Sequence, residues 1–156
     1  GVMYFQRVPE VLYEEWERTV DVICKGTLHG VGAVLPKFVE RGRGHIVNIS
    51  SDAGRKVFPG LAVYSAAKFF VEALTQGIRL ETASTGVRVT SIQPGNVATP
   101  LLGLSTDASA VEQYGAPSGA KVLEPEDVAR AVVYAVMQPE YVGVNEVLIE
   151  PREEPC

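Results

Sequence analysis

Two short runs of β-branched apolar residues, joined by a long helical pattern, most constrain how this chain can fold. The runs are His45–Ile49 and Val87–Ile92, and turn residues flank both of them. Residues 64–84 between them are mostly good helix formers, and Gly86 follows at a typical C-terminal position. A strand connected to the next strand through a helix is typical of a parallel sheet. The first run is typical of a strand buried on both faces.

The rest of the sequence continues this alternation of helices and strands. Apolar residues recur at three- and four-residue steps from Leu12 to Phe38, which predicts one long helix from about Pro9 to Glu40, bent or broken near Pro36. Residues 100–121 are predicted to form a mobile excursion that contains one short helix at 108–114. A third helix is predicted at 124–137 and a last strand at 146–149. We therefore predict an α/β fold, a partial Rossmann-like, doubly wound parallel sheet that forms a single domain over residues 1–156.

Composition narrows the classes of function. The chain has 156 residues, of which 46% are hydrophobic and 21% charged, as in one globular domain. A net charge of −5 disfavours nucleic-acid binding, because neutralising phosphates requires clustered Lys and Arg. No apolar run approaches the ~18 residues that span a bilayer, so no membrane partner is expected. Cys24 and Cys156 form no CxxC pair, and we expect no disulfide framework, no metal site and a cytoplasmic location.

Ser51, Tyr64 and Lys68 form a candidate catalytic set. Tyr64 and Lys68 are four residues apart in a predicted helix and therefore share one face, although such a pair also occurs by chance on a helix surface. An ammonium so placed favours the phenolate. We therefore expect the pKa of Tyr64 to fall from its ordinary value of ~10 towards neutrality, where a phenol can serve as general acid or base.

Two segments at strand ends add to this set. Ser51 directly follows the first strand, and Pro94–Thr99 follows the second. Ligands in open α/β sheets bind outside the carboxyl ends of the strands. Taken alone, Ser51 is better explained as a cap or turn residue, and Pro94–Thr99 is as well explained as a strand-ending turn. Together with Tyr64 and Lys68, they indicate one site on one edge of the sheet.

These residues resemble the short-chain dehydrogenase/reductase family over essentially the whole chain. Gly44–Ser51 ends thirteen residues before Tyr64-Ser-Ala-Ala-Lys68, which matches the family's Ser and Tyr-x-x-x-Lys motifs with their usual spacing. Pro94–Thr99 matches the stretch that contacts the nicotinamide in the family. The resemblance implies an NAD(P)-dependent oxidoreductase that interconverts a carbonyl and an alcohol by hydride transfer.

The resemblance also assigns a role to each site residue. Tyr64 would exchange the proton with the substrate oxygen, and Ser51 would polarise that oxygen. Lys68 would hold the nicotinamide ribose and lower the pKa of Tyr64. The implied contacts with NAD or NADP are Tyr64, Lys68, Pro94, Gly95, Val97 and Thr99.

Two departures from the family pattern accompany these motifs. Ile23 stands where family members usually carry an Asn that supports a water chain to the lysine. The family also begins with a strand, a Gly-rich turn and a helix that bind the pyrophosphate, and this sequence contains no such pattern. We therefore expect the chain to be the C-terminal portion of such an enzyme, with Gly1-Val2 at the end of the family's fourth strand. Its first strand would then have an unpaired edge.

Two functional hypotheses remain open. The first is the catalytic and substrate-binding part of a carbonyl reductase or alcohol dehydrogenase for a small molecule. Leu101, Leu102 and Leu104 predict an apolar lid and a nonpolar carbonyl substrate. The second is a noncatalytic fragment that acts as an oligomerisation module, which Ile23 and the missing Gly-rich turn favour. In either case the resemblance implies a homodimer or homotetramer formed through the two long helices.

Overall fold

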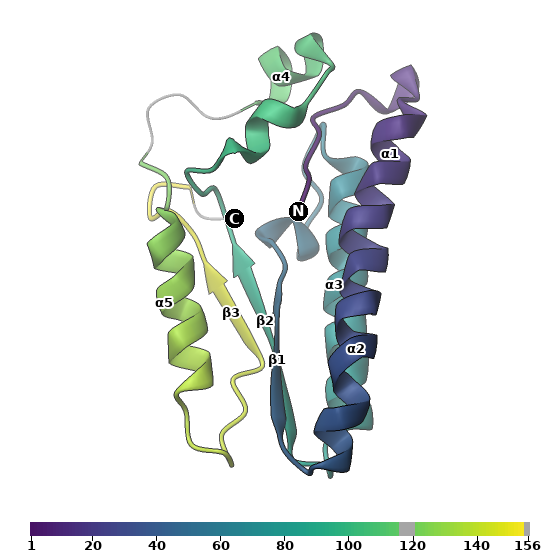
Figure 1. The fold of residues 1–156 in the computed structure, drawn as a ribbon. Coiled ribbons are helices and arrows are strands. Elements are labelled where there is room, and N and C mark those ends of the chain that lie inside the picture. Colours follow the sequence, from purple (N-terminus) through teal and green to yellow (C-terminus); the bar gives the residue numbers. More distant parts are fainter. Residues whose placement is uncertain (116–120, 155–156) are drawn as a thin grey trace.

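Three parallel strands form the centre of the fold (Figure 1). They are β1 (Gly44–Ile49), β2 (Val87–Pro94) and β3 (Glu146–Ile149), in the order β1-β2-β3. The computed structural model describes residues 1–115 and 121–154. Ile49 lies opposite Ile92, and Pro94 lies opposite Ile149, so the carboxyl ends of all three strands meet at one edge. The predicted parallel α/β sheet is confirmed.

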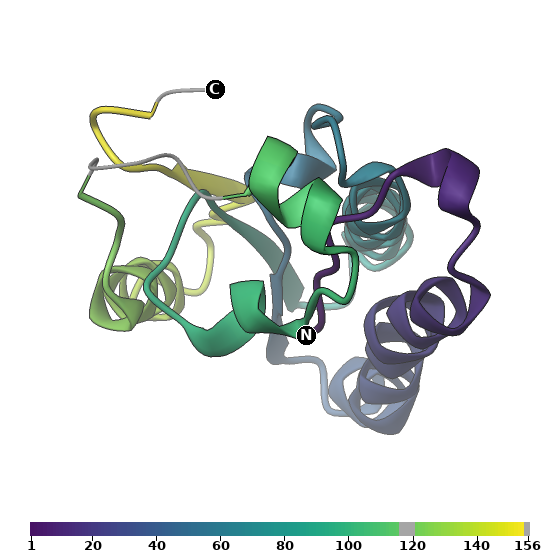
Figure 2. The same cartoon turned by 90° about the horizontal axis from the view of Figure 1, so that it is seen from above.

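Helices cover both faces of the sheet (Figures 1 and 2). Helices α2 (Gly26–Glu40) and α3 (Ala62–Glu81) lie together on one face and contact β1 and β2. Helix α5 (Pro125–Val136) lies on the other face, against β2 and β3. This arrangement is doubly wound, as predicted. Within the described residues, none of the helices combines the length and the apolar character that a bilayer crossing requires.

The predicted helix over residues 9–40 is divided into several parts. A 3₁₀ turn at Val8–Glu10 is followed by Val11 in a left-handed conformation, with φ of 51°, so the helical run begins at Tyr13 and not at Pro9. The run then consists of α1 (Tyr13–Thr19), a π-helical turn (Val20–Lys25) and α2. Helix α2 continues through Pro36 to Glu40, so the helix is not broken there. Apolar residues on both sides of Pro36 pack against the sheet, which offsets the lost hydrogen bond.

The apolar core consists of two clusters. The first lies between the sheet and helices α2 and α3 and contains Val31, Ile46, Ile78, Val87 and Val89. The second, which we call the upper cluster, lies near the carboxyl edge of the sheet, where the N-terminal segment, the π-helical turn and α3 meet. Its buried members are Met3, Phe5, Ile23, Ala53, Leu61, Tyr64, Ala67, Val71 and Ala110. The segment before α1 is therefore part of the core.

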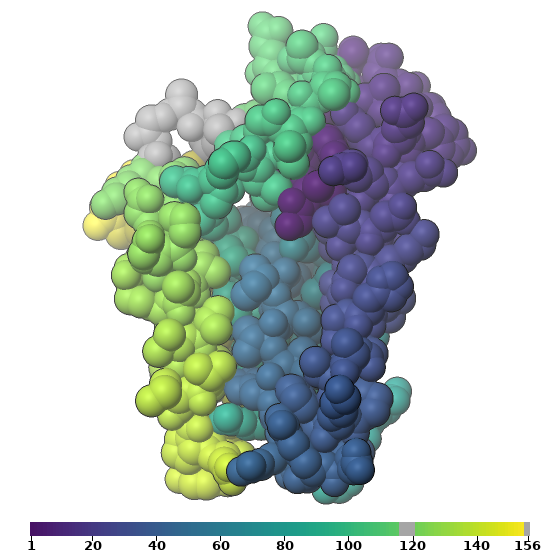
Figure 3. Space-filling model, in the orientation of Figure 1, coloured from purple at the N-terminus to yellow at the C-terminus, as the bar shows by residue number. Residues whose placement is uncertain are grey.

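Strand β1 is an edge strand with one uncovered face. Among the described residues it pairs only with β2, which confirms the predicted unpaired edge. Ile46 is buried under α2, whereas Ile49 is 49% exposed. The expectation that β1 is buried on both faces is therefore wrong, because α5 lies over β2 and β3 and leaves β1 open on that side. Figure 3 shows this surface, recessed between α5 and α2.

The C-terminal half follows the predicted order closely. A 3₁₀ turn at Pro100–Leu104 and helix α4 (Ala108–Tyr114) form the described part of the excursion, and the predicted short helix is confirmed. Glu124 and Asp127 form a reciprocal capping box at the start of α5. Gly86, between α3 and β2, has φ of 74°, and a Cβ atom there would collide with the carbonyl group of Gly42. Residues 116–120 of the excursion and Cys156 lie outside the described residues.

Candidate active site

The predicted site residues gather at the carboxyl ends of β1 and β2. The Ser50 amide donates a hydrogen bond to the Ile92 carbonyl group over 2.7 Å, so the chain leaves β1 beside the end of β2. Ser51 is the next residue, and Pro94 is the last residue of β2. Tyr64 and Lys68 come from the first two turns of α3, which starts near the same edge. The fold therefore places the separate sequence motifs in one region.

Ser51 caps the short 3₁₀ turn Asp52–Gly54. Its Oγ accepts a hydrogen bond from the Ala53 amide over 3.1 Å and donates one to Asp52 Oδ1 over 2.8 Å. The cap that its sequence position favoured is therefore present. The Ser51 hydroxyl also acts as a hydrogen-bond partner of Tyr64 and favours its phenolate. One buried hydroxyl thus serves the turn and faces the phenol.

Tyr64 and Lys68 are stacked on the inner face of α3. Both side chains are buried, and Lys68 Nζ lies 5.6 Å from the centroid of the Tyr64 ring. The ammonium donates a hydrogen bond to the Ile49 carbonyl group, at the end of β1, over 3.1 Å. This bond ties the lysine to the sheet, as expected for a residue that must hold a fixed position. The predicted four-residue pairing on one helix face is confirmed.

Burial controls the protonation of this pair. It raises the pKa of Tyr64 to about 12, with a further increase from the Asp52 carboxylate, while the Ser51 hydrogen bond opposes both. Burial lowers the pKa of Lys68 to about 8, and the Glu72 carboxylate opposes that change. The expectation that Lys68 brings the Tyr64 pKa towards neutrality is wrong for this chain. Burial of the phenolate has the largest effect on this pKa, and the neighbouring Lys68 ammonium does not offset it.

The segment Pro94–Thr99 continues from β2 along the same edge. Pro94 is buried, Val97 is half-buried and Thr99 is exposed. The segment is held in place by Leu123, whose amide donates to the Asn96 carbonyl over 2.9 Å and whose carbonyl accepts from the Ala98 amide over 2.8 Å. At Gly95 a Cβ atom would lie only 3.2 Å from Pro151 Cδ, so the missing side chain permits this close passage.

Ile23 lies in the π-helical turn and is buried in the upper cluster together with Tyr64. Its side chain contributes an apolar contact where the family pattern has an amide. Its carbonyl group accepts a hydrogen bond from Thr27 Oγ1 over 2.6 Å. The position therefore supports the packing around the phenol and supplies no polar side-chain atom to the site.

Two carboxylates that act on the site were missed by the sequence interpretation. Asp52 follows Ser51 directly and disfavours the Tyr64 phenolate. Glu72 lies one helical turn after Lys68 and favours its ammonium. The spacing of four residues between Lys68 and Glu72 was a usable signal, because it places both on one side of α3.

The described part of the excursion is fastened to the N-terminal segment. Ser105 Oγ accepts a hydrogen bond from the Phe5 amide over 2.9 Å. Asp107 Oδ2 accepts from the amide and from Nε of Arg7, over 3.1 Å and 3.3 Å, and Thr106 donates to the Glu15 carboxylate. We call these contacts the latch. Of the three predicted lid residues, two pack against the upper cluster and the third is largely exposed: Leu101, Leu102 and Leu104, respectively.

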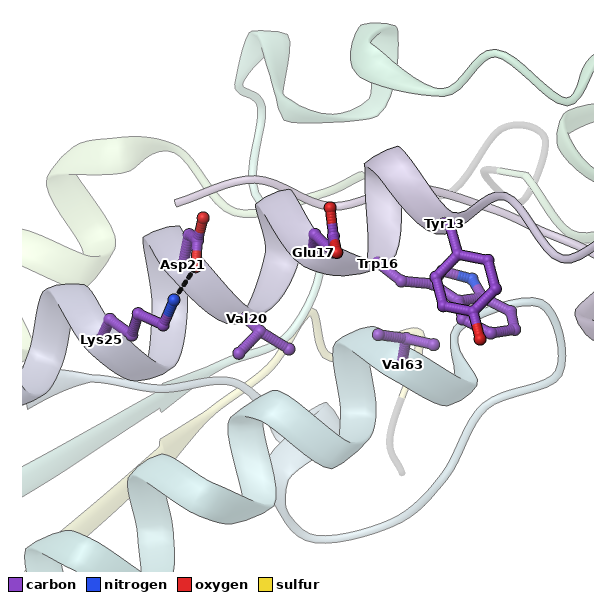
Figure 4. A pocket seen from close by; sticks show the side chains of 7 residues that line it. All are labelled: Tyr13, Trp16, Glu17, Val20, Asp21, Lys25 and Val63. Atoms are coloured by element: carbon purple, nitrogen blue, oxygen red, sulfur yellow. Dashed lines mark ion pairs between the residues drawn. The ribbon is translucent and has the colours of Figure 1, made fainter.

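Two surface grooves lie outside this set of residues. The larger, of about 510 Å³, lies between the N-terminal helical run and α3 (Figure 4). Tyr13, Trp16 and Val20 face Val63 across it, beside the ion pair of Lys25 and Asp21. It contains none of the three candidate catalytic residues. The described residues contain no group of His, Cys, Asp or Glu that could hold a metal ion. The site offers a phenol, an ammonium and a hydroxyl, which together can pass a proton to or from a substrate oxygen.

Comparison with known proteins identifies the family. A profile of short chain dehydrogenases matches residues 1–109. The chain is 63% identical over 155 residues to a glycine betaine reductase of Emericella nidulans. The aligned region covers 99% of this chain and 12% of that protein. It is 46% identical over 151 residues to an uncharacterized oxidoreductase of Staphylococcus saprophyticus, which covers 97% of this chain and 60% of that protein.

The solved structures agree with this result. The closed form of a serine dehydrogenase complexed with NADP+ superimposes with a TM-score of 0.90 at 34% identity, over 100% of this chain and 64% of that one. The chain thus spans less than two thirds of the length of each of these relatives. The matching sequence profile, the parallel sheet and the clustered Ser, Tyr and Lys show that the chain belongs to the short-chain dehydrogenase family.

Proposed function

We propose that this chain supplies the catalytic and substrate-binding part of an NAD(P)-dependent oxidoreductase that interconverts a carbonyl and an alcohol. The observation that carries the proposal is the convergence of Ser51, Tyr64 and Lys68 at the carboxyl edge of the sheet, with Lys68 Nζ 5.6 Å from the Tyr64 ring. All three side chains are buried, so the packing around them restricts their movement and keeps their polar groups close to one another. A surface pair formed by chance would be solvated instead.

The site residues fit a nicotinamide cofactor. An ammonium has three N–H donors, and the Ile49 carbonyl accepts from Lys68. Its remaining donors can bind ribose hydroxyl groups, which would also repay part of the cost of burying the charge. Pro94–Thr99 would hold the nicotinamide ring from the neighbouring strand end. The solved relative described above is complexed with NADP+, which supports a cofactor of this class.

The mechanism follows from the protonation of the site. Hydride transfer to or from the substrate carbon would be the chemistry that a nicotinamide held by these residues supplies. Ser51 would turn its hydroxyl hydrogen from Asp52 Oδ1 to the carbonyl oxygen, and Tyr64 would deliver the proton that turns this oxygen into a hydroxyl group. Because the pKa of Tyr64 is about 12, the phenol is protonated near neutral pH and is ready to act as the acid in carbonyl reduction. Alcohol oxidation requires the phenolate, and therefore a charged Lys68 beside it.

The relatives give a first substrate class to test. One is named for glycine betaine and the other for serine. Both molecules carry a cationic nitrogen two bonds from the carbon that bears oxygen. A small aldehyde with a cationic nitrogen is therefore the first candidate, beside the nonpolar carbonyls predicted from Leu101, Leu102 and Leu104.

The test uses the complete protein that contains this chain, with NADH or NADPH oxidation followed by absorbance. The panel contains the aldehyde that corresponds to glycine betaine, together with nonpolar aldehydes and ketones. We expect turnover with at least one compound and an at least ~100-fold lower kcat in Tyr64→Phe, which lacks the proton donor. Tyr141→Phe is the matched control, because Tyr141 is 90% exposed. No oxidation of either cofactor with any compound would refute the proposal.

The alternative, a noncatalytic oligomerisation module, has less support, because it gives no reason for the buried ammonium. The subunit interface that this alternative requires would also be present in an oligomeric enzyme. Apolar side chains are exposed along the N-terminal helical run, including Tyr13, Val20 and Leu28, and the first two of them line the groove of Figure 4. We propose that a second copy covers this surface in a homodimer or homotetramer. Sedimentation of Val20→Asp should show a smaller species than the unchanged chain. Binding of NADPH by the 156-residue chain, followed by cofactor fluorescence, would count against a purely noncatalytic role.

A further inference from the structure

Glu72 is held in one position by two buried donors from β2. Its Oε1 accepts a hydrogen bond from Ser91 Oγ over 2.6 Å, and its Oε2 accepts one from Gln93 Nε2 over 2.8 Å. Ser91 and Gln93 are almost completely shielded from solvent. Hydrogen bonds to both oxygens fix the position of this carboxylate, which stands one helical turn after Lys68.

Arg55 determines how Gln93 faces this carboxylate. Its Nη1 donates to Gln93 Oε1 and to Glu146 Oε2, both over 3.1 Å. Because the oxygen of the Gln93 amide accepts from Arg55, the amide NH₂ group is directed at Glu72. The bonds form a path from Glu146 through Arg55 and Gln93 to Glu72. The path lies along the smaller groove, of about 370 Å³, beside α3.

The turn Asp52–Gly54 packs directly on this part of α3. A Cβ atom at Gly54 would lie 2.9 Å from Ser50 Oγ, 3.0 Å from Glu72 Cγ and 3.1 Å from the Lys68 carbonyl oxygen. A glycine is therefore needed for the close approach. The packing therefore fixes the turn directly against the part of α3 that carries Lys68 and Glu72.

We propose that Glu72 is a positioning residue whose fixed carboxylate, one helical turn from Lys68, favours the charged form of the buried ammonium beside Tyr64. The inference rests on the role proposed above for Lys68. Burial lowers the pKa of Lys68 and Glu72 raises it, in agreement with the geometry. The elements around Lys68 also carry other charged or titratable groups: Tyr64, Arg79 and Glu81 on α3, Asp52 and Arg55 at the adjoining turn, Asp21, Cys24 and Lys25 on the π-helical turn, His45 on β1, Arg88 on β2 and Glu146 on β3.

The test measures the protonation of Lys68 directly in the 156-residue chain. Lysine is labelled with ¹³C at Cε, the Lys68 signal is identified by its loss in Lys68→Arg, and its chemical shift is followed against pH. Glu72→Gln should weaken proton binding by Lys68 about tenfold, as expected for the loss of one carboxylate a helical turn away. Glu72→Met is a second neutral variant of similar length, for use if the amide of Gln is not accommodated beside Ser91.

Two controls separate charge from packing. Ser91→Ala removes a hydrogen bond of Glu72 but keeps its charge, and Glu146→Gln removes a carboxylate that is already paired with Arg55. Both should leave proton binding by Lys68 within about twofold of the unchanged chain. A purely structural role predicts that Ser91→Ala and Glu72→Gln have the same effect, and that result would overturn the inference.

The readout is independent of catalysis. A shifted Lys68 titration in a complete protein that shows no turnover would support this inference and count against the proposed function. An unshifted titration in a folded Glu72→Gln chain would overturn the inference even if the complete protein is active.

Discussion

Replacing Lys68 by methionine should stabilise the folded chain at neutral pH. The ammonium is buried, and burial lowers its pKa from the ordinary value of 10.5 to about 8. The unfolded chain binds this proton more tightly than the folded chain, so the buried charge opposes folding. Methionine has a similar length and no charge, so it removes this cost and keeps most of the packing.

The magnitude follows from the two pKa values. Each tenfold change in proton affinity corresponds to ~1.4 kcal/mol, so a pKa of about 8 in place of 10.5 corresponds to about 3 kcal/mol. Losing the hydrogen bond to the Ile49 carbonyl costs about 1 kcal/mol. We therefore expect Lys68→Met to be more stable by about 2 kcal/mol at pH 7. The stability gained by the variant depends on pH. The cost of burying the Lys68 charge is fully present below about pH 8, falls as the pH rises from about 8 to 10.5, and is absent above that range.

Urea unfolding of both chains at pH 7 and at pH 10.5 measures this difference. The variant should be the more stable chain at pH 7 and should lose its advantage at pH 10.5. A variant that is less stable by the same amount at both pH values would refute the reasoning, because the cost would then come from packing and not from charge.

Three further predictions concern stability. Burial and Arg88 lower the pKa of His45, so as the pH falls His45 becomes protonated at a higher pH in the unfolded chain than in the folded chain, and the stability of the fold should decrease below about pH 6.5. In urea titrations, His45→Gln should reduce this loss of stability. The control His29→Gln, at an exposed site, should not reduce it. Gly86→Ala should cost about 2–4 kcal/mol, because φ is positive and a Cβ atom has no room, whereas Gly77→Ala, in the open interior of α3, should be neutral or stabilising by thermal unfolding. Asp107→Ala removes the cap of α4 and the anchor of Arg7 and should cost about 1 kcal/mol; an unchanged melting temperature would show that the latch contributes nothing.

The catalytic set could be predicted from the sequence because local rules place it. Helical spacing puts Tyr64 and Lys68 on one face, and the end of a strand puts Ser51 on the ligand-binding edge. The boundaries of β3 and α4 were also accessible, because turn residues and apolar periodicity define them. These features depend on a few neighbouring residues.

The remaining features depend on contacts that the sequence does not state. The pKa of Tyr64 is set by how deeply the fold buries it, which the spacing to Lys68 does not contain. The exposure of Ile49 depends on what lies over β1, and the hydrophobicity of a strand cannot specify that. The apolar pattern around Val20–Lys25 is regular, so it does not distinguish the observed π-helical turn from a continuous α-helix. The carboxylate of Glu72 is held by hydrogen bonds from Ser91 and Gln93 on β2, and the sequence does not show that these residues meet.

The latch sets a time order for folding during synthesis. Phe5 and Ser105 are 100 residues apart in the chain, so roughly 5–20 s of translation separates their appearance. Residues 2–6 are buried in the finished fold, and until the later segment arrives these apolar side chains have an incomplete set of partners. Residues 2–6 therefore remain partly exposed until residues 105–107, which form the latch with this segment, have been synthesised.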